Sequence, residues 1–138
     1  MINFYDQIPK DQSKSAQTIL LAEDDPFIAR MYETKLTTAG YNVVVKNNGL
    51  NAYEAIKNLQ PDLLIIDINM PEVTGLELIK NLTNIGFDFK AHPVMILTNS
   101  SNPRDIEVAK SLQADYLVKA EMTPKEVLEK IQDKIGKP

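Results

Sequence analysis

The chain contains an uninterrupted apolar run from Leu63 to Ile66, and this run ends at Asp67. A strand with apolar residues at consecutive positions has both faces buried, which is typical of a central strand in a parallel sheet. A carboxylate at the end of such a strand is costly unless it is solvated, paired or bound to a metal ion. In open α/β sheets, ligands bind at the carboxyl ends of the strands. Asp67 is therefore the first candidate functional residue.

The rest of the chain alternates between expected strands and expected helices. Further apolar runs of strand length occupy 18–22, 43–45, 94–97 and 116–118. The segments after each strand carry apolar residues at helical spacing, and several of them begin with a capping residue followed by proline. Five strands alternating with five helices predict an α/β fold, a doubly wound parallel sheet with helices on both faces.

Composition excludes several classes of chemistry. The net charge of −4 argues against a surface for nucleic acid or for an anionic membrane. The absence of cysteine excludes disulfides, thiolate zinc sites and cysteine nucleophiles, and the single His92 excludes multi-histidine metal sites. We expect His92 to be a loop residue. No run has transmembrane length and no signal peptide is evident, so a cytoplasmic location is the expectation.

A length of 138 residues fits one domain. We expect residues 1–17 to form a flexible N-terminal arm and residues 18–135 to form the domain. A nucleotide-binding fold would need a glycine-rich turn after the first strand. Three acidic residues, 23–25, stand there instead and would repel a pyrophosphate, so the sequence argues against a nucleotide cofactor.

Polar residues follow four of the expected strands: Glu23 and Asp24, then Asp67, Thr98 and Lys119. In the strand order 2-1-3-4-5, the first and third strands are neighbours, so the three carboxylates would lie together. Clustered negative charges oppose the fold unless a cation binds, and carboxylates with waters suit Mg²⁺.

This set of residues matches the needs of phosphoryl transfer. A carboxylate at Asp67 can attack phosphorus to give an acyl phosphate. Mg²⁺ and Lys119 would neutralise the phosphoryl oxygens, and the Thr98 hydroxyl could donate to one of them. Each residue alone has an ordinary structural explanation as a cap, a loop lysine or a turn residue. Their joint placement at successive strand ends is what predicts a site.

The sequence resembles the receiver domain of bacterial two-component response regulators, the CheY-like family. The resemblance covers roughly residues 18–135, and that family has the strand order 2-1-3-4-5. The matching residues are the acidic cluster 23–25 with Pro26, the segment 67–71 with Gly75, then Thr98, and 116–119.

The resemblance implies a role for each matching acidic residue. Asp67 would be the phosphoacceptor, taking phosphate from a phosphohistidine on a histidine kinase or phosphotransfer protein. Asp24 would bind Mg²⁺ directly, Glu23 would bind it through water, and the backbone carbonyl of Asn69 would complete the protein's share of the ligands.

The resemblance also implies a switch. Lys119 would contact the phosphoryl group, Thr98 would be drawn toward it, and Tyr116 would turn inward. The surface around the last helices would then report phosphorylation to a downstream target protein. Such a domain is not an enzyme, apart from autophosphorylation by small donors and slow autodephosphorylation.

Two positions depart from the family pattern. Ala120 follows Lys119 where the family usually has a proline in a cis peptide bond, so we predict a trans bond and a repositioned loop. Asn99 follows Thr98 where the family usually has a small residue, and we expect it to narrow access to the site.

Two other functions stay open at this point. A phosphatase of the haloacid-dehalogenase type also uses an aspartyl nucleophile, but it needs a second carboxylate two residues later, where this chain has Asn69. A receiver-like interaction module that ignores phosphorylation is the other alternative, which the departures at Asn99 and Ala120 favour.

Overall fold

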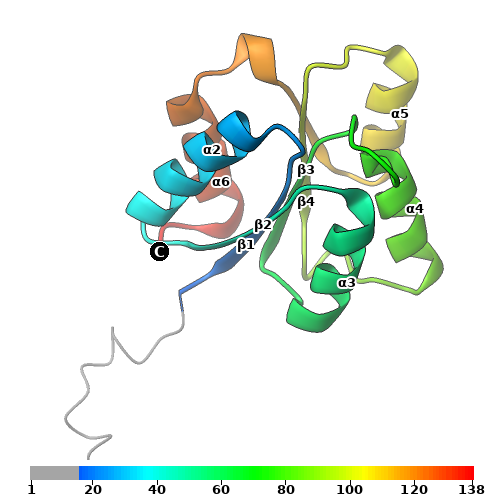
Figure 1. Ribbon diagram of the computed structural model, residues 1–138, viewed down its shortest axis with the longest axis horizontal. Helices are drawn as coiled ribbons and strands as arrows, with labels where there is room; N and C mark the ends of the chain where they lie inside the picture. The colour runs from blue at the N-terminus through cyan, green and yellow to red at the C-terminus, as the bar shows by residue number, and fades with distance from the viewer. Residues whose placement is uncertain (1–15) are drawn as a thin grey trace, which may run out of the picture.

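One parallel sheet, in the order β2-β1-β3-β4-β5, forms the centre of the computed structural model, which describes residues 16–138 (Figure 1). Every neighbouring pair of strands is parallel, which confirms the predicted fold class and strand order. The strands are β1 (Thr18–Ala22), β2 (Asn42–Lys46), β3 (Leu63–Ile66), β4 (Val94–Thr98) and β5 (Asp115–Val118).

Helices cover both faces of the sheet. In Figure 1, α2 and α6 lie on one side of the strands, and α3, α4 and α5 lie on the other. The α-helices are α2 (Pro26–Thr38), α3 (Gly49–Leu59), α4 (Gly75–Asn84), α5 (Pro103–Ser111) and α6 (Pro124–Ile135). A short 3₁₀ helix that the sequence did not predict, η2 (Lys119–Glu121), directly follows β5.

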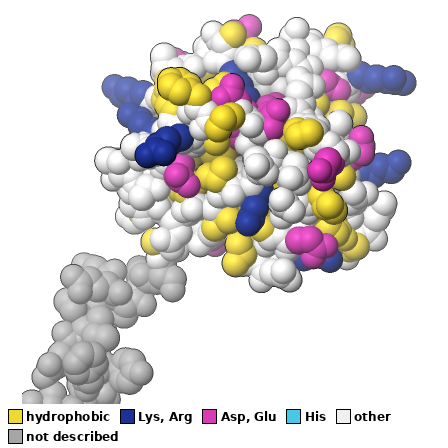
Figure 2. All heavy atoms as spheres, in the orientation of Figure 1, with side chains coloured by type: hydrophobic (Ala, Val, Ile, Leu, Met, Phe, Trp, Pro, Cys, Tyr) yellow, Lys and Arg dark blue, Asp and Glu magenta, His cyan; other side chains and the backbone are white. Residues whose placement is uncertain are grey.

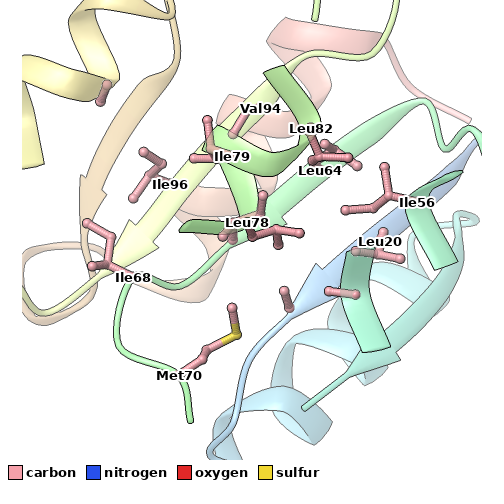
Figure 3. Close-up of a cluster of buried hydrophobic side chains, with 14 residues drawn as sticks. Leu20, Ile56, Leu64, Ile68, Met70, Leu78, Ile79, Leu82, Val94 and Ile96 are labelled. Atoms are coloured by element: carbon pink, nitrogen blue, oxygen red, sulfur yellow. The ribbon is translucent and has the colours of Figure 1, made fainter. Parts of the chain in front are cut away.

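The central strand β3 explains how one apolar run serves two cores. All four of its residues are buried. Leu64 and Ile66 belong to the core beneath α3 and α4, part of which Figure 3 shows. Leu63 and Ile65 belong to the core beneath α2 and α6. Because side chains alternate along a strand, a strand covered on both faces has no position that faces solvent, and all of its side chains are apolar.

The predicted arm, residues 1–17, lies mostly outside the described residues. Ala16 and Gln17 are described, and both are hydrogen-bonded to the domain. The Gln17 amide nitrogen donates to the Ile135 carbonyl at 2.6 Å, and the Asn42 N–H donates to the Gln17 carbonyl at 2.9 Å.

Charges of both signs are distributed over the surface. On the face that Figure 2 shows, basic and acidic side chains alternate with hydrophobic ones and no continuous basic area is visible. Within residues 16–138, no helix is both long enough and apolar enough to cross a membrane.

The buried phenol of Tyr41 should make stability depend on alkaline pH. Tyr41 is 2% exposed and donates to the Gly136 carbonyl at 2.6 Å. Burial raises the pKa of Tyr41 above its ordinary value. Above pH 10 the unfolded chain therefore releases a proton that the folded chain keeps, so stability falls as the pH rises from there. The Tyr41→Phe variant, which lacks this proton, should be less stable than wild type by about 1 kcal/mol at pH 7.

Urea unfolding of both proteins at pH 7, 9 and 10.5 checks this expectation. The difference in unfolding free energy should shrink above pH 10. A difference that stays constant across this range would show that Tyr41 does not titrate in this way.

Candidate functional site

Three carboxylates meet at the carboxyl ends of neighbouring strands β1 and β3. One carboxylate oxygen from each of Glu23, Asp24 and Asp67 lies within 4.8 Å of the others. The backbone places them, because the Glu23 N–H donates to the Lys46 carbonyl and the Asp67 N–H donates to the Ala22 carbonyl, both at 3.0 Å. These bonds continue the sheet one residue past the strand ends. The predicted clustering of the acidic residues is therefore present.

Burial divides the three acids into two kinds. Glu23 and Asp67 are 2% and 6% exposed, whereas Asp24 is exposed to solvent. The next acid, Asp25, is the N-cap of α2, and its side chain accepts from the backbone N–H groups of Phe27 and Ile28. The Asp25 carboxylate therefore caps α2, whereas the Glu23 and Asp24 carboxylates belong to the site.

Lys119 supplies the positive charge. Its Nζ lies 2.5 Å from Glu23 Oε2 and 3.0 Å from Asp67 Oδ2. Burial raises the pKa of Glu23 above its ordinary value. The hydrogen bond from Lys119 lowers this pKa and the negative charge of Asp67 raises it, but burial is the largest effect. Burial alone would lower the pKa of Lys119, but the two carboxylates raise it above its ordinary value. The ammonium is therefore charged at neutral pH.

The balance of charge favours an additional cation. Among the described residues, Lys119 is the one cationic side chain ion-paired with these three carboxylates, so negative charge remains in excess within the group. Glu23 and Asp24 also line an open pocket of about 560 Å³ between α2 and β2, through which a hydrated ion can reach them. An all-oxygen donor set open to water suits Mg²⁺.

The loop after β3 is anchored on both sides of Asn69. Ile68 and Met70 are buried in the core beneath α3 and α4 (Figure 3), while Asn69 is exposed. The Asn69 N–H donates to Asp67 Oδ1 at 3.3 Å. Because Lys119 binds the other oxygen, both oxygens of the Asp67 carboxylate are held.

Thr98 and Tyr116 are connected through a residue that the sequence analysis missed. Thr98 is fully buried at the end of β4, and its Oγ1 accepts from the Ser100 N–H at 3.3 Å. The Tyr116 hydroxyl donates to the Ser100 carbonyl at 2.5 Å. Ser100 also donates from its hydroxyl to Asp105 of α5 at 2.8 Å. Only its place two residues after Thr98 could have indicated it, because each of these bonds depends on how the loop folds.

The loop after Lys119 has the predicted trans bond, since no cis peptide occurs within residues 16–138. Lys119 reaches both buried carboxylates from this loop. Asn99 is exposed, and its Oδ1 accepts from the Ala120 N–H at 3.1 Å. Narrower access caused by Asn99 stays a prediction.

His92 lies away from the site. Its Nδ1 is 2.7 Å from the Pro61 carbonyl, in the connections that lead into β3 and β4. That is the amino end of the strands, opposite the carboxylates. His92 is a loop residue, as expected.

Comparison with known proteins gives consistent matches. The model of the response regulator receiver domain matches residues 19–132. The curated protein "Response regulator GtcR" of Aneurinibacillus migulanus is 34% identical, over 85% of this chain and 47% of that protein. The "Chemotaxis protein CheY" of Thermotoga maritima is 32% identical, over 86% of this chain and 97% of that protein.

Solved structures agree with this match. The structure of the chemotaxis protein CheY4 of Vibrio cholerae has a TM-score of 0.76 at 28% identity, covering 86% of this chain and 98% of that chain. The chain spans about half the length, or less, of many of the curated relatives that it matches.

Proposed function

Because the chain belongs to the response regulator receiver domain family, we propose that it is a phosphorylation-activated switch in which Asp67 accepts the phosphoryl group. The observation that carries this proposal is the position of Asp67. Its carboxylate is buried at the end of the central strand, with Lys119 Nζ 3.0 Å away and two further carboxylates beside it.

The proposed reaction transfers a phosphoryl group from the phosphohistidine of a histidine kinase or phosphotransfer protein. A carboxylate oxygen of Asp67 forms a bond to phosphorus, the phosphorus–nitrogen bond of the donor breaks, and its electron pair stays on the imidazole. The Asn69 N–H and Lys119 orient the nucleophile before the reaction. During transfer, Lys119 balances charge on the phosphoryl oxygens and Thr98 donates its hydroxyl hydrogen to one of them.

The acidic residues fit a resident Mg²⁺. We propose that Asp24 and Asp67 bind the ion directly, Glu23 binds it through water, and the Asn69 backbone carbonyl is the fourth protein contribution. The bound ion supplies positive charge opposite the transferring phosphoryl oxygens. The excess of carboxylates over ammonium groups supports this assignment.

The output of the switch would pass through Ser100. The Thr98 hydroxyl that would donate to a phosphoryl group on Asp67 also accepts from the Ser100 N–H, and Ser100 in turn is bonded to the Tyr116 hydroxyl and the Asp105 carboxylate. A shift of Thr98 therefore changes the loop between β4 and α5, and a downstream target protein would read the surface around it.

A small phosphodonor such as acetyl phosphate tests the proposed function. With Mg²⁺ the chain should gain one phosphate that is stable in acid and labile in base, and peptide mapping after borohydride reduction should locate it at Asp67. No incorporation at saturating Mg²⁺ would refute the proposal. Sustained release of inorganic phosphate over many turnovers would instead favour a phosphatase, although the exposed Asn69 offers no second carboxylate there.

Asp24→Asn is expected to weaken Mg²⁺ binding by about 100-fold, equivalent to about 3 kcal/mol. The reason is that asparagine removes one ligand charge from the group of three carboxylates. Calorimetric titration with Mg²⁺ measures the change. Asp25→Asn is the matched control, because it removes the same charge one residue away while asparagine still caps α2. Equal losses in the two variants would contradict direct binding by Asp24.

A further inference from the structure

A side chain joins the segment after β4 to the segment after β5. Asn99 Oδ1 accepts a hydrogen bond from the Ala120 N–H at 3.1 Å. Asn99 follows the last residue of β4, and Ala120 is the residue after Lys119. This bond therefore holds the peptide group that immediately follows the lysine of the site.

The register of the sheet explains this bond. Thr98 pairs with Val118 in the last step of the ladder between β4 and β5. Beyond that step Asn99 and Lys119 stand at the end of the sheet, where the regular ladder no longer supplies partners. The side-chain amide of Asn99 supplies an acceptor there, so it extends the connection between the two strands.

Among residues 16–138, few other hydrogen bonds support the turn that begins at Lys119. Within η2, the Met122 N–H lies 3.4 Å from the Lys119 carbonyl, which is a long hydrogen bond. Glu23 and Asp67 hold the ammonium end of Lys119, but a four-carbon chain separates that end from the backbone. The Asn99 bond is what orients the backbone end on the side away from β5.

We propose that Asn99 is a positioning residue for Lys119. Through the Ala120 N–H it holds the turn after β5, and it thereby keeps the Lys119 ammonium between Glu23 and Asp67. Its consequence for phosphoryl transfer rests on the proposed function, whereas its effect on Lys119 does not.

The first test is Asn99→Ala. Phosphorylation by acetyl phosphate at saturating Mg²⁺ should become about tenfold slower, because small misplacements of a charged group reduce transfer strongly. Mg²⁺ affinity should not fall, because all three carboxylates remain, and the midpoint of urea unfolding should fall by no more than the loss of one exposed hydrogen bond allows. A variant that is merely damaged would lose Mg²⁺ affinity and stability as well, and that result would overturn the proposal.

A double-mutant cycle tests the route through Ala120. Lactic acid in place of Ala120, introduced by semisynthesis, replaces only the N–H by an ester oxygen and should slow transfer as much as Asn99→Ala, and the double variant should be no slower than either. Ala120→Gly keeps the N–H and is the matched control, with a rate near that of wild type. Additive losses in the double variant would overturn the proposal.

Nuclear magnetic resonance provides readouts that do not need phosphorylation. In wild type, the Lys119 ammonium held by two carboxylates should give a slowly exchanging ¹H–¹⁵N signal, and Asn99→Ala should accelerate exchange of this signal and of the Ala120 amide. If wild type takes up no phosphate, the proposed function fails, and these exchange rates still decide the role of Asn99. Unchanged exchange at both groups would overturn it.

Discussion

Asp67→Asn is expected to reduce phosphate incorporation from acetyl phosphate to about one hundredth of the wild-type level or less, because a carboxamide does not act as the nucleophile in this reaction. Asparagine keeps the shape of the side chain and removes one of three clustered negative charges, so the variant should fold. Lys119 keeps its bond to Glu23. The loss can therefore be assigned to the missing nucleophile.

Mass spectrometry of the intact chain after incubation with the donor and Mg²⁺ measures this loss. Asp133→Asn is the control, since Asp133 is exposed on α6 and belongs to no part of the site. This variant should gain phosphate as wild type does. Equal incorporation in wild type and Asp67→Asn would place the phosphate elsewhere and refute Asp67 as the acceptor.

Gly75→Ala is expected to lower the free energy of unfolding by about 3 kcal/mol, since overpacking a close contact displaces its surroundings. Gly75 begins α4 and packs against the backbone of the site. A Cβ on Gly75 would lie 2.2 Å from the Asp67 carbonyl oxygen and 2.9 Å from Ile66 Cγ2. Neither group is the end of a flexible side chain, and the Gly75 N–H is bonded to the Ile68 carbonyl. Either α4 or the end of β3 must therefore move.

Urea unfolding measures the cost, and acetyl phosphate labelling shows whether Asp67 is displaced. Gly86→Ala is the comparison, because nothing lies within 4 Å of its Cβ position and its φ of +75° imposes only conformational strain. That strain should cost about 1 kcal/mol. If Gly75→Ala lowers the free energy of unfolding no more than Gly86→Ala does, the structure accommodates the added Cβ near Asp67 without strain, and the prediction is wrong.

Most of the fold could be predicted from local pattern. The apolar run 63–66 indicates a strand buried on both faces, and the structure places its residues in two cores on opposite sides of the sheet. The starts of α2 and α6 could also be predicted, because Asp25 and Thr123 cap them through bonds to backbone N–H groups within three residues. The short helix η2 was missed, because the Asn99 side chain that binds its Ala120 N–H comes from a distant segment of the chain.

The residues of the site could be predicted from the sequence, but most of the contacts between them could not. Glu23, Asp24 and Asp67 come together because parallel strands end at the same edge, which topology alone requires. The direct bonds of Lys119 to Glu23 and Asp67 depend on how the loop after β5 turns. The link from Thr98 through Ser100 to Tyr116 depends in the same way on the loop after β4.

Local sequence patterns are sufficient to predict the alternation of strands and helices, the buried strand that ends at Asp67, and the kinds of side chain at the strand ends. These depend on periodicity and on the chemistry of neighbouring residues. The folded arrangement was needed to see that Asn99 binds Ala120, that Gly75 approaches the Asp67 carbonyl, and that Ser100 connects Thr98 to Tyr116. The geometry of these contacts follows from strand register and loop conformation, which no local pattern contains.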